Sequence, residues 1–164
     1  MCDLALLRQK YKPDRVRVLF VGESPPANGT FFYKCDSKLY KHTKKVFQEF
    51  WIFKSDKEFL ERFKNEGFYL EDLCDEPINH LPKRERKAKR NENIETLAKK
   101  LKQLNPEVII VVMKSIQRQV KGAIKIAGLN PKYYAIPFPS RGWQKEFEKQ
   151  LKGILTEIGI KKAH

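Results

Sequence analysis

The sequence predicts an α/β protein, a three-layer α/β/α arrangement whose central four-stranded parallel sheet lies between two layers of helices. Four short apolar segments have the composition of buried strands, and a helical pattern separates each one from the next. Parallel strands joined through helices require right-handed crossovers, which cover both faces of the sheet. The chain has 164 residues, enough for one compact domain, and we expect residues 1–164 to form it.

Runs of β-branched and other apolar residues predict the four strands. The first run extends from Val16 to Val21, and the second from Phe68 to Leu73. The third, Val108 to Met113, is the longest uninterrupted aliphatic stretch, so we expect it at the centre of the sheet. A short fourth run, Tyr133 to Pro137, completes the sheet.

Between the first two strands, apolar spacing and capping residues predict two helices. The first begins near Asp36, and its apolar residues are Val46, Phe47, Phe50 and Trp51. The second follows a capping box, in which Ser55 and Glu58 are three residues apart, and it ends at Gly67.

Three further helices are predicted after the second strand. Asn93 is expected to cap a helix that Asn105-Pro106 stops. Ser115 is expected to cap the next one, which ends at Gly128. The last helix has an inward face formed by Phe147, Leu151, Ile154, Leu155 and Ile158.

The charge balance is strongly basic, with 34 Lys and Arg against 20 Asp and Glu and a formal net charge of +14. Such a protein attracts polyanions, and nucleic acid is the commonest polyanion in a cytoplasm. A lysine-rich surface of the kind found in thermophile proteins explains the charge equally well. Composition alone leaves both interpretations open.

Other features narrow the class of protein. The longest aliphatic stretch is far shorter than the roughly 20 residues of a membrane span, so we expect no membrane partner. The segment from Met1 to Arg8 has no basic leader and no long apolar region, which favours a cytoplasmic location. We expect reduced thiols and no metal ion, because none of these residues has metal-ligand spacing: Cys2, Cys35, Cys74, His42, His80 and His164.

Three irregular segments each follow a predicted strand, and they are Gly22 to Tyr33, Asp72 to Pro82, and Phe138 to Trp143. The carboxyl ends of parallel strands meet at one edge of a sheet, where ligands bind. The first segment has neither G-x-G-x-x-G nor G-x-x-x-x-G-K-[ST], so it is not a phosphate-binding fingerprint. We therefore expect the three segments to form one functional site.

The first and third segments carry short motifs. Gly22-Glu23-Ser24-Pro25-Pro26 resembles the first motif of the uracil-DNA glycosylase superfamily, which reads G-E-A-P-G in the iron–sulfur branch and G-Q-D-P-Y-H in the best-known branch. Phe138-Pro139-Ser140 is similar to the second motif, H-P-S. Between them, Phe68 to Asp72 and the following loop resemble the region where the family carries a base-reading Asn.

This resemblance covers about residues 15 to 155. It implies a uracil-DNA glycosylase-like fold and an enzyme that extrudes a nucleotide from DNA, stacks its base on an aromatic ring and hydrolyses the N-glycosidic bond. That reaction builds positive charge on the sugar and negative charge on the departing base. A site for it needs an acceptor for water and donors aimed at the base.

The resemblance implies roles for the residues of the first segment. Phe32, or its neighbour Phe31, would stack on the base, because the family has an aromatic residue just after the first motif. Glu23 would position or activate water, although a solvated or helix-capping role fits the same residue. Ser24 stands in the place of the catalytic Asp of the best-known branch. Pro26 replaces the Tyr that blocks a 5-methyl group there, which would admit thymine or a larger base.

The second and third segments would read the base. Asp72 falls where the family has its reading Asn, and the same pocket would include Gly22, Asn79 and Ser140. An Asn both accepts and donates hydrogen bonds, whereas an ionised Asp only accepts. Either the pocket prefers a base edge with adjacent donors, or burial keeps Asp72 protonated. A loop-capping role is a further alternative for Asp72.

The third segment departs from the family at its first residue. Phe138 replaces the His that stabilises the departing base, and Arg141 would supply a donor instead or contact a phosphate. Trp143, together with Arg141, would fill the vacated base stack. A hydrophobic staple at the start of the last helix is the alternative for Trp143.

The run from Lys83 to Arg90 has six basic residues and one acidic residue, directly after the second segment. Such a run is usually a solvated face or a flexible connection. At an edge that faces DNA it would clamp the phosphate backbone, through Lys83, Arg84, Arg86 and Lys87. If six phosphates are neutralised, DNA affinity falls with salt at a log–log slope of about −5.

The sequence therefore favours a DNA base-repair glycosylase that hydrolyses the N-glycosidic bond of a flipped-out uracil or another deaminated or mismatched base. We expect a monomer that acts on single- or double-stranded DNA and needs no cofactor, since the iron–sulfur branch uses four cysteines and this chain has three. One alternative is a nucleic-acid-binding protein of the same fold without catalysis, because the motif Asp and His are absent. The other, a small phosphohydrolase or nucleotide-binding enzyme, needs a phosphate cradle or carboxylate cluster that the sequence lacks.

Overall fold

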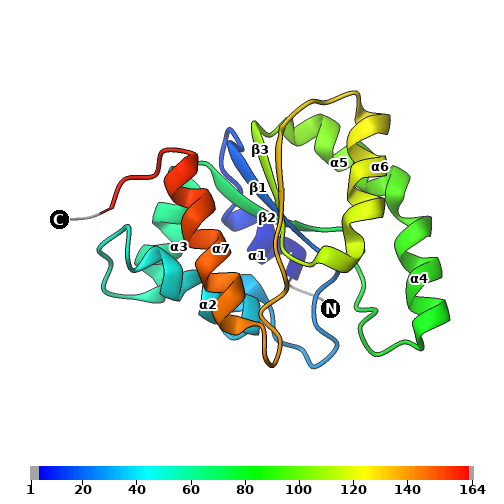
Figure 1. Cartoon of the computed structure of the whole chain (residues 1–164), viewed down its shortest axis with the longest axis horizontal. Coiled ribbons are helices and arrows are strands. Elements are labelled where there is room, and N and C mark those ends of the chain that lie inside the picture. The colour runs from blue at the N-terminus through cyan, green and yellow to red at the C-terminus, as the bar shows by residue number, and fades with distance from the viewer. Residues whose placement is uncertain (1–3, 163–164) are drawn as a thin grey trace.

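A computed structural model describes residues 4–162 and shows the predicted parallel sheet between two helical layers (Figure 1). The strand order is β2-β1-β3-β4, and each neighbouring pair is parallel. The strands are β1 (Val18–Gly22), β2 (Phe68–Asp72), β3 (Val108–Val111) and β4 (Lys132–Ala135). The α/β/α fold class expected from the sequence is confirmed.

The register of the sheet brings two of the predicted site residues to the same level. Val18 pairs with Phe68 on one side and with Val108 on the other. Four residues later along both strands, Gly22 pairs with Asp72. The carboxyl ends of β1 and β2 therefore lie side by side, and the segments that follow them leave from the same edge.

Helices cover both faces of the sheet (Figure 1). One face carries α2 (Lys38–Phe47), α3 (Asp56–Asn65) and α7 (Gln144–Glu157). The other carries α5 (Ile94–Leu104) and α6 (Gln117–Ala127). Two short 3₁₀ helices follow β1 and β3, and they are η1 (Phe32–Lys34) and η2 (Lys114–Ile116).

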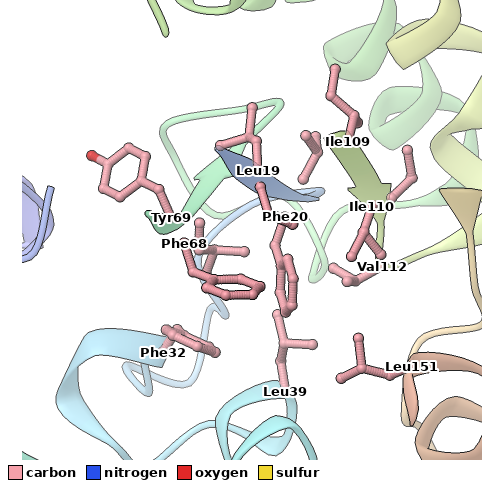
Figure 2. Packing of buried hydrophobic residues seen from close by; sticks show 14 of the residues in the cluster. Leu19, Phe20, Phe32, Leu39, Phe68, Tyr69, Ile109, Ile110, Val112 and Leu151 are labelled. Atoms are coloured by element: carbon pink, nitrogen blue, oxygen red, sulfur yellow. The ribbon is translucent and has the colours of Figure 1, made fainter. Parts of the chain in front are cut away.

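An aromatic cluster fills the space between the sheet and the α2–α3 layer. Figure 2 shows Phe20 and Phe68 pointing toward Phe32, whereas Leu19 points to the opposite face. The ring of Phe63, in α3, lies 5.6 Å from that of Phe20 and 5.2 Å from that of Phe68. Each such pair contributes about 0.5–1.5 kcal/mol beyond its area burial. This cluster fixes η1, and with it the first loop, against the sheet.

Helix boundaries agree with the capping signals in part. Ser37 caps α2 and Ser55 caps α3, each accepting a hydrogen bond from a backbone N–H three residues later. The helix expected to include Phe50 and Trp51 ends earlier, at Phe47, and both residues belong to the turn that follows. Their side chains are nevertheless buried in the core, as the apolar spacing predicted.

Two predicted N-caps are corrected. Ser115 does not cap α6, because it lies inside η2 and the helix begins after Ile116. Asn93 does occupy the N-cap position of α5, but its side chain donates instead to the carbonyl of Lys89. The reason is that another helix immediately precedes α5. A carbonyl in the last turn of that helix accepts the hydrogen bond from the Asn93 side-chain amide.

That preceding helix is α4 (Lys83–Glu92), formed by the basic run. Of the alternatives left open for this run, a flexible connection is excluded, because the run forms a helix with no fully buried residue. Apolar packing therefore does not hold it in place. Two arginines that turn inward hold it instead, as described below.

Helix α1 (Leu4–Lys10) was not predicted, and it lies beside the edge strand β2. Its Arg8 donates a hydrogen bond of 2.6 Å to the carbonyl oxygen of Leu70. Cys35 and Cys74 are free thiols, whereas Cys2 and His164 lie outside the described residues. No helix in the described part of the chain is long and apolar enough to cross a membrane.

Candidate functional site

The three irregular segments meet at one cavity of about 520 Å³ beyond the carboxyl ends of the strands. This volume is in the range of sites for small molecules. The β1 segment contributes Gly22, Glu23, Ser24, Pro26 and Phe32, the β2 segment Asp72 and Asn79, and the β4 segment Phe138 and Ser140. Every residue predicted to be catalytic or to form the base pocket therefore lines the same cavity, except Arg141, the predicted donor to the departing base, which is exposed outside it.

The buried carboxylate of Glu23 holds two arginines of α4. Arg86 donates to both of its oxygens, from Nε to Oε2 at 2.9 Å and from Nη2 to Oε1 at 2.6 Å. Arg90 donates from Nε to Oε2 at 2.5 Å. Glu23 is 4% exposed, and both arginines line the cavity. Paired carboxylate–guanidinium contacts of this kind fix the orientation of the planar guanidinium groups.

Asp72 is also buried and is also paired with an arginine. Its Oδ2 accepts a hydrogen bond of 2.9 Å from Nη2 of Arg8. Its Oδ1 lies directly over Gly22, where a Cβ atom would approach to 2.7 Å. Burial raises the pKa of Asp72, and the charge of Arg8 opposes that rise. Glycine at position 22 is what allows the carboxylate to reach this place.

Both candidate stacking rings are buried and both line the cavity. Phe32 belongs to the aromatic cluster, with its ring 5.6 Å from that of Phe63 and 5.3 Å from that of Tyr40. Phe31 lies under the guanidinium group of Arg8, whose central carbon is 5.0 Å from the ring centroid. The sequence left the choice between the two rings open, and their neighbours now differ clearly.

Two hydrogen bonds join the segment after β1 to the segment after β2. The hydroxyl oxygen of Ser24 accepts from the backbone N–H of Ile78 at 3.2 Å. The side-chain oxygen of Asn79 accepts from the backbone N–H of Ala27 at 2.8 Å. Asn79 thus fixes the rim of the cavity, in addition to lining it.

The β4 segment is divided between the cavity and the outer surface. Phe138 and Ser140 line the cavity, whereas Arg141 and Trp143 are exposed beyond it. Trp143 is 53% exposed, and no side chain caps α7 at that position. The alternative of a buried hydrophobic staple for Trp143 does not agree with this exposure.

The remaining residues of the basic run point outward. Lys83, Arg84 and Lys87 are exposed on α4, whereas Arg86 is half-buried against Glu23. Arg86 was predicted to contact phosphates together with the other three. The structure separates it from them, because its guanidinium group is engaged inside the cavity.

Sequence reasoning missed several residues of this site. Arg90 follows Arg86 by four residues, a spacing that places both on one face of a helix, so a helical interpretation of the run would have paired them. Met113 and Ser115 line the cavity just after β3, where the rule on carboxyl ends also applies. Arg8 had no local signal, because its partner Asp72 is 64 residues away.

No cluster of three or more His, Cys, Asp or Glu side chains suited to a metal ion occurs within residues 4–162. His42 is engaged elsewhere, with Nδ1 at 2.6 Å from the Oε2 atom of Glu148 in α7. His80 is exposed on the segment after β2. The polar and aromatic groups that line the cavity are arginines, carboxylates, hydroxyls and phenyl rings.

Residues 9–159 match the family model described as "Uracil DNA glycosylase superfamily". The matched range contains all four strands and every residue of the cavity named above. A comparison with curated proteins finds no match. The match confirms the resemblance expected from the two short motifs.

Proposed function

Because this chain belongs to the uracil-DNA glycosylase superfamily, we propose that it removes a base from DNA by hydrolysing the N-glycosidic bond. The base would be a flipped-out uracil or another deaminated or mismatched base. The observation that carries the proposal is the meeting of the three loop segments at one cavity with aromatic and charged walls. A flipped nucleotide needs such a pocket, with a ring to stack on and polar groups at its edge.

The reaction needs positive charge near the departing base. When the bond between C1′ and the base nitrogen breaks, its electron pair stays on the base, and water then adds to C1′. The proton of that water passes to the base anion, so that a free base and an abasic sugar result. Donors fixed in advance around the developing anion lower the barrier most.

We assign the stabilisation of the base anion to Arg86 and Arg90. Both line the cavity, and Glu23 holds them in place through both of its oxygens. They take over the role of the family's His, whose position Phe138 occupies. Arg141, the earlier candidate, is exposed outside the cavity. Glu23 then serves as the anchor of the two arginines, since its oxygens already accept their hydrogen bonds.

We assign the stacking of the base to Phe31. One face of its ring lies under Arg8 and the residue lines the cavity, whereas the ring of Phe32 packs within the aromatic cluster. A positive charge on one face of a ring leaves the other face for a base. Ser24 contributes its hydroxyl, which accepts from Ile78 and has its own proton to donate into the cavity.

The surface around the cavity supports binding to DNA. Lys83, Arg84 and Lys87 form an exposed basic face on α4, and Arg141 adds charge on the opposite segment. Phosphate contacts of this kind supply affinity without reading sequence. Trp143 is the exposed aromatic residue that we propose as the wedge for the vacated base stack.

One observation favours a second candidate function, a DNA-binding protein of the same fold without catalysis. Both oxygens of Glu23, the carboxylate predicted to position water, accept hydrogen bonds from arginines. A general base for water would need a carboxylate with a free oxygen facing the reacting sugar. In the proposed glycosylase reaction no general base is needed, because the arginines lower the barrier by stabilising the base anion.

The test is base release from defined DNA duplexes. Duplexes carrying uracil, hypoxanthine, xanthine or mismatched thymine are incubated with the protein, and abasic sites are then cleaved with alkali. We expect an abasic product from at least one of them. We expect Arg86→Gln to slow its formation about a hundredfold, the usual effect of removing one such donor.

The matched control is Arg15→Gln, because Arg15 is an exposed arginine at the opposite end of the sheet, paired with Glu107. This variant should release the base at the wild-type rate. If no duplex yields an abasic product although the protein binds them all, the chain is a DNA-binding protein without catalysis. If Arg86→Gln works at the wild-type rate, the assignment of the donor is wrong.

A further inference from the structure

We infer that the protein has a second activity, cleavage of the DNA strand at an abasic site, and that the Lys38 amine performs it by forming an imine with C1′ of the abasic sugar. The inference goes beyond the proposed function and rests on it, because its substrate is the product of base release. The new bond is made by a residue to which base release assigns no role.

Lys38 supplies the amine of the cavity. Within residues 4–162 it is the only lysine that lines the cavity. The other cationic side chains there, Arg86 and Arg90, donate to the carboxylate of Glu23. A guanidinium group stays charged, whereas a lysine amine adds to carbonyl carbons to form imines. An aldehyde that reaches this cavity therefore meets one nucleophilic amine in its lining.

Lys38 lies at the mouth of the cavity, where a sugar would be. It is exposed to solvent, whereas Phe31 and Asp72 in the same lining are buried. A flipped nucleotide stays attached to its strand through the sugar, so the base enters first and the sugar remains nearest the outside. The C1′ atom left after base release is therefore at the level of the cavity where Lys38 is accessible.

The backbone on both sides of Lys38 is fixed. Lys38 is the first residue of α2, and the hydroxyl of Ser37 before it accepts from the backbone N–H of Tyr40 at 3.1 Å. Ser37 and Leu39 are both buried and both line the cavity. The start of α2 is thus anchored in the cavity wall between two buried neighbours. A long side chain on an anchored backbone is suited to bring an amine to one carbon atom.

The Lys38 amine also differs from the nearby lysine amines in its contacts. Lys34 donates to the carbonyl oxygen of Gly29 at 3.3 Å, and Lys44 donates to Asp56 at 2.8 Å. No hydrogen bond or ion pair within residues 4–162 engages the side chain of Lys38. An amine without a protein partner can approach a bound sugar without first breaking a contact.

The reaction balances with water as the only co-reactant. The abasic sugar opens to an aldehyde at C1′, the Lys38 nitrogen adds to this carbon with its electron pair, and water leaves as the imine forms. A proton then passes from C2′ to water. The electrons of that C–H bond form a C2′–C3′ double bond, and the bond from C3′ to the phosphate oxygen breaks. Water finally hydrolyses the imine and restores the amine.

The test begins with a chemically prepared abasic duplex, so that no base has to be released first. The full chain is incubated with it in the presence of cyanoborohydride, which reduces an imine to a stable amine. We expect a covalent complex on a denaturing gel, and peptide mapping after nuclease digestion should locate the sugar on Lys38. Without cyanoborohydride, the strand should be cut before any alkali is added. No complex, or an adduct spread over other amines, overturns the inference.

Two matched variants locate the nucleophile. Lys38→Arg keeps the positive charge but cannot form an imine, so both the trapped complex and the strand cleavage should be lost. Lys41→Arg is the control, because Lys41 is an exposed lysine of the same helix that does not line the cavity. It should react as the wild type does. A trapped complex with Lys38→Arg, or its loss in both variants, contradicts the assignment. If Lys38→Arg does not fold, the mapped adduct of the wild type still decides.

A matched substrate tests the chemistry. A duplex with the tetrahydrofuran analogue of an abasic site has no oxygen at C1′ and cannot open to an aldehyde. We expect the protein to bind this duplex but to form no covalent complex with it and to leave its strand intact. Cleavage of the analogue would show that the strand is cut by some route other than an imine.

The two proposals can fail separately. A protein that is trapped on the abasic duplex through Lys38 but releases no base from any duplex supports the strand cleavage and contradicts the glycosylase. A protein that releases a base, but leaves strands uncut until alkali is added and gives no trapped complex, supports the glycosylase and contradicts the role of Lys38.

Discussion

Single residues in this protein owe their importance to contacts that only the folded chain creates. Gly22 is an example. Its backbone angles are not unusual, and its lack of a side chain matters because of one neighbouring atom, Oδ1 of Asp72. The Asp72 carboxylate occupies the space that a Cβ of residue 22 would take. Sequence reasoning placed both residues in the site through motif resemblance, but could not foresee that one makes room for the other.

Gly22→Ala should therefore destabilise the protein and displace Asp72. The Cβ would lie 2.7 Å from Oδ1, closer than such atoms approach in real structures, so we expect a loss of about 1–3 kcal/mol in the free energy of unfolding. Urea unfolding measures it. The control is Gly153→Ala in α7, where no atom lies within 4 Å of the added carbon. It should be neutral or slightly stabilising, as alanine is in a helix.

The buried thiol of Cys74 is predicted to react slowly with alkylating reagents. Burial, with Glu23 and Asp72 nearby, raises the pKa of its thiol to about 11. Since the thiolate is the reactive form, the native thiol should resist alkylation at pH 8, where it is protonated. Alkylation with iodoacetamide followed by peptide mapping should show slow modification of Cys74 in the native protein and rapid modification in urea. Equal rates in both conditions would contradict the buried location.

At the scale of elements, local sequence patterns predicted the sheet and most of the helices that cover it. The strands β1 and β3 are buried along their whole length, and their continuous apolar sequences identify them. Strand β2 is equally buried, but its apolar run ends at Leu70 and is followed by Glu71 and Asp72. The short helix α1 was missed because its seven residues include no fully buried side chain. Its role depends on the contact between Arg8 and Asp72, and no local pattern reports a pairing over such a distance.

Helix α4 shows why the state of a charged run is hard to predict. It has no apolar face, and it stays in place through Arg86, Arg90 and their common partner Glu23. A further contact joins Asn91 to the Nε2 atom of Gln119, at 3.0 Å. The run could be recognised as basic from its sequence, but its helical state depends on an acid that lies 63 and 67 residues earlier.

Glu23→Gln should therefore loosen α4 while the sheet stays folded. Removing one partner of a buried ion pair costs about 3–5 kcal/mol, because the remaining charge loses its compensation. We expect backbone amides of residues 83–92 to exchange with deuterium about tenfold faster or more, with little change in β1 and β3. The control is Glu85→Gln, an exposed acid on the same helix. Unchanged exchange in the Glu23 variant would show that other contacts hold α4.

The whole molecule is strongly positive, but only part of its positive charge faces the solvent. The net charge of +14 agrees with a polyanion partner, and the family match now favours DNA over a merely solubilising surface. Part of this charge, however, is neutralised by carboxylates inside the protein. Arg86 and Arg90 neutralise Glu23, and Arg8 neutralises Asp72, so fewer cations face the solvent than the sequence suggests.

This division changes the expected salt dependence of DNA binding. The six basic residues of the run predicted a slope near −5, but two of them, Arg86 and Arg90, face Glu23. Four neutralised phosphates give a slope of about −3.6 in a plot of log affinity against log salt. Fluorescence anisotropy with a labelled duplex between low and moderate salt measures it. A slope near zero would remove the basic face of α4 from the interface.

Charge-removing variants locate the contribution. Replacing Lys83, Arg84 and Lys87 together by Gln should make the slope shallower by about 2.7. The matched control replaces three exposed cations at the amino-terminal end of the sheet, which are Arg15, Lys102 and Lys132. That triple variant has the same net charge, and its slope should equal that of the wild type. Equal shifts in both triple variants would mean that net charge, rather than the face of α4, governs binding.

The hydrogen bonds from Ile78 to Ser24 and from Ala27 to Asn79 have a mechanical consequence. They couple two walls of the cavity into one rigid frame. The opposite wall, which includes Phe138 and Ser140, has no such hydrogen bond to that frame among those of residues 4–162, so it is the less constrained side of the cavity. Because Trp143, the proposed wedge, follows Ser140 by three residues, any shift of this short loop would move the cavity wall and the wedge together.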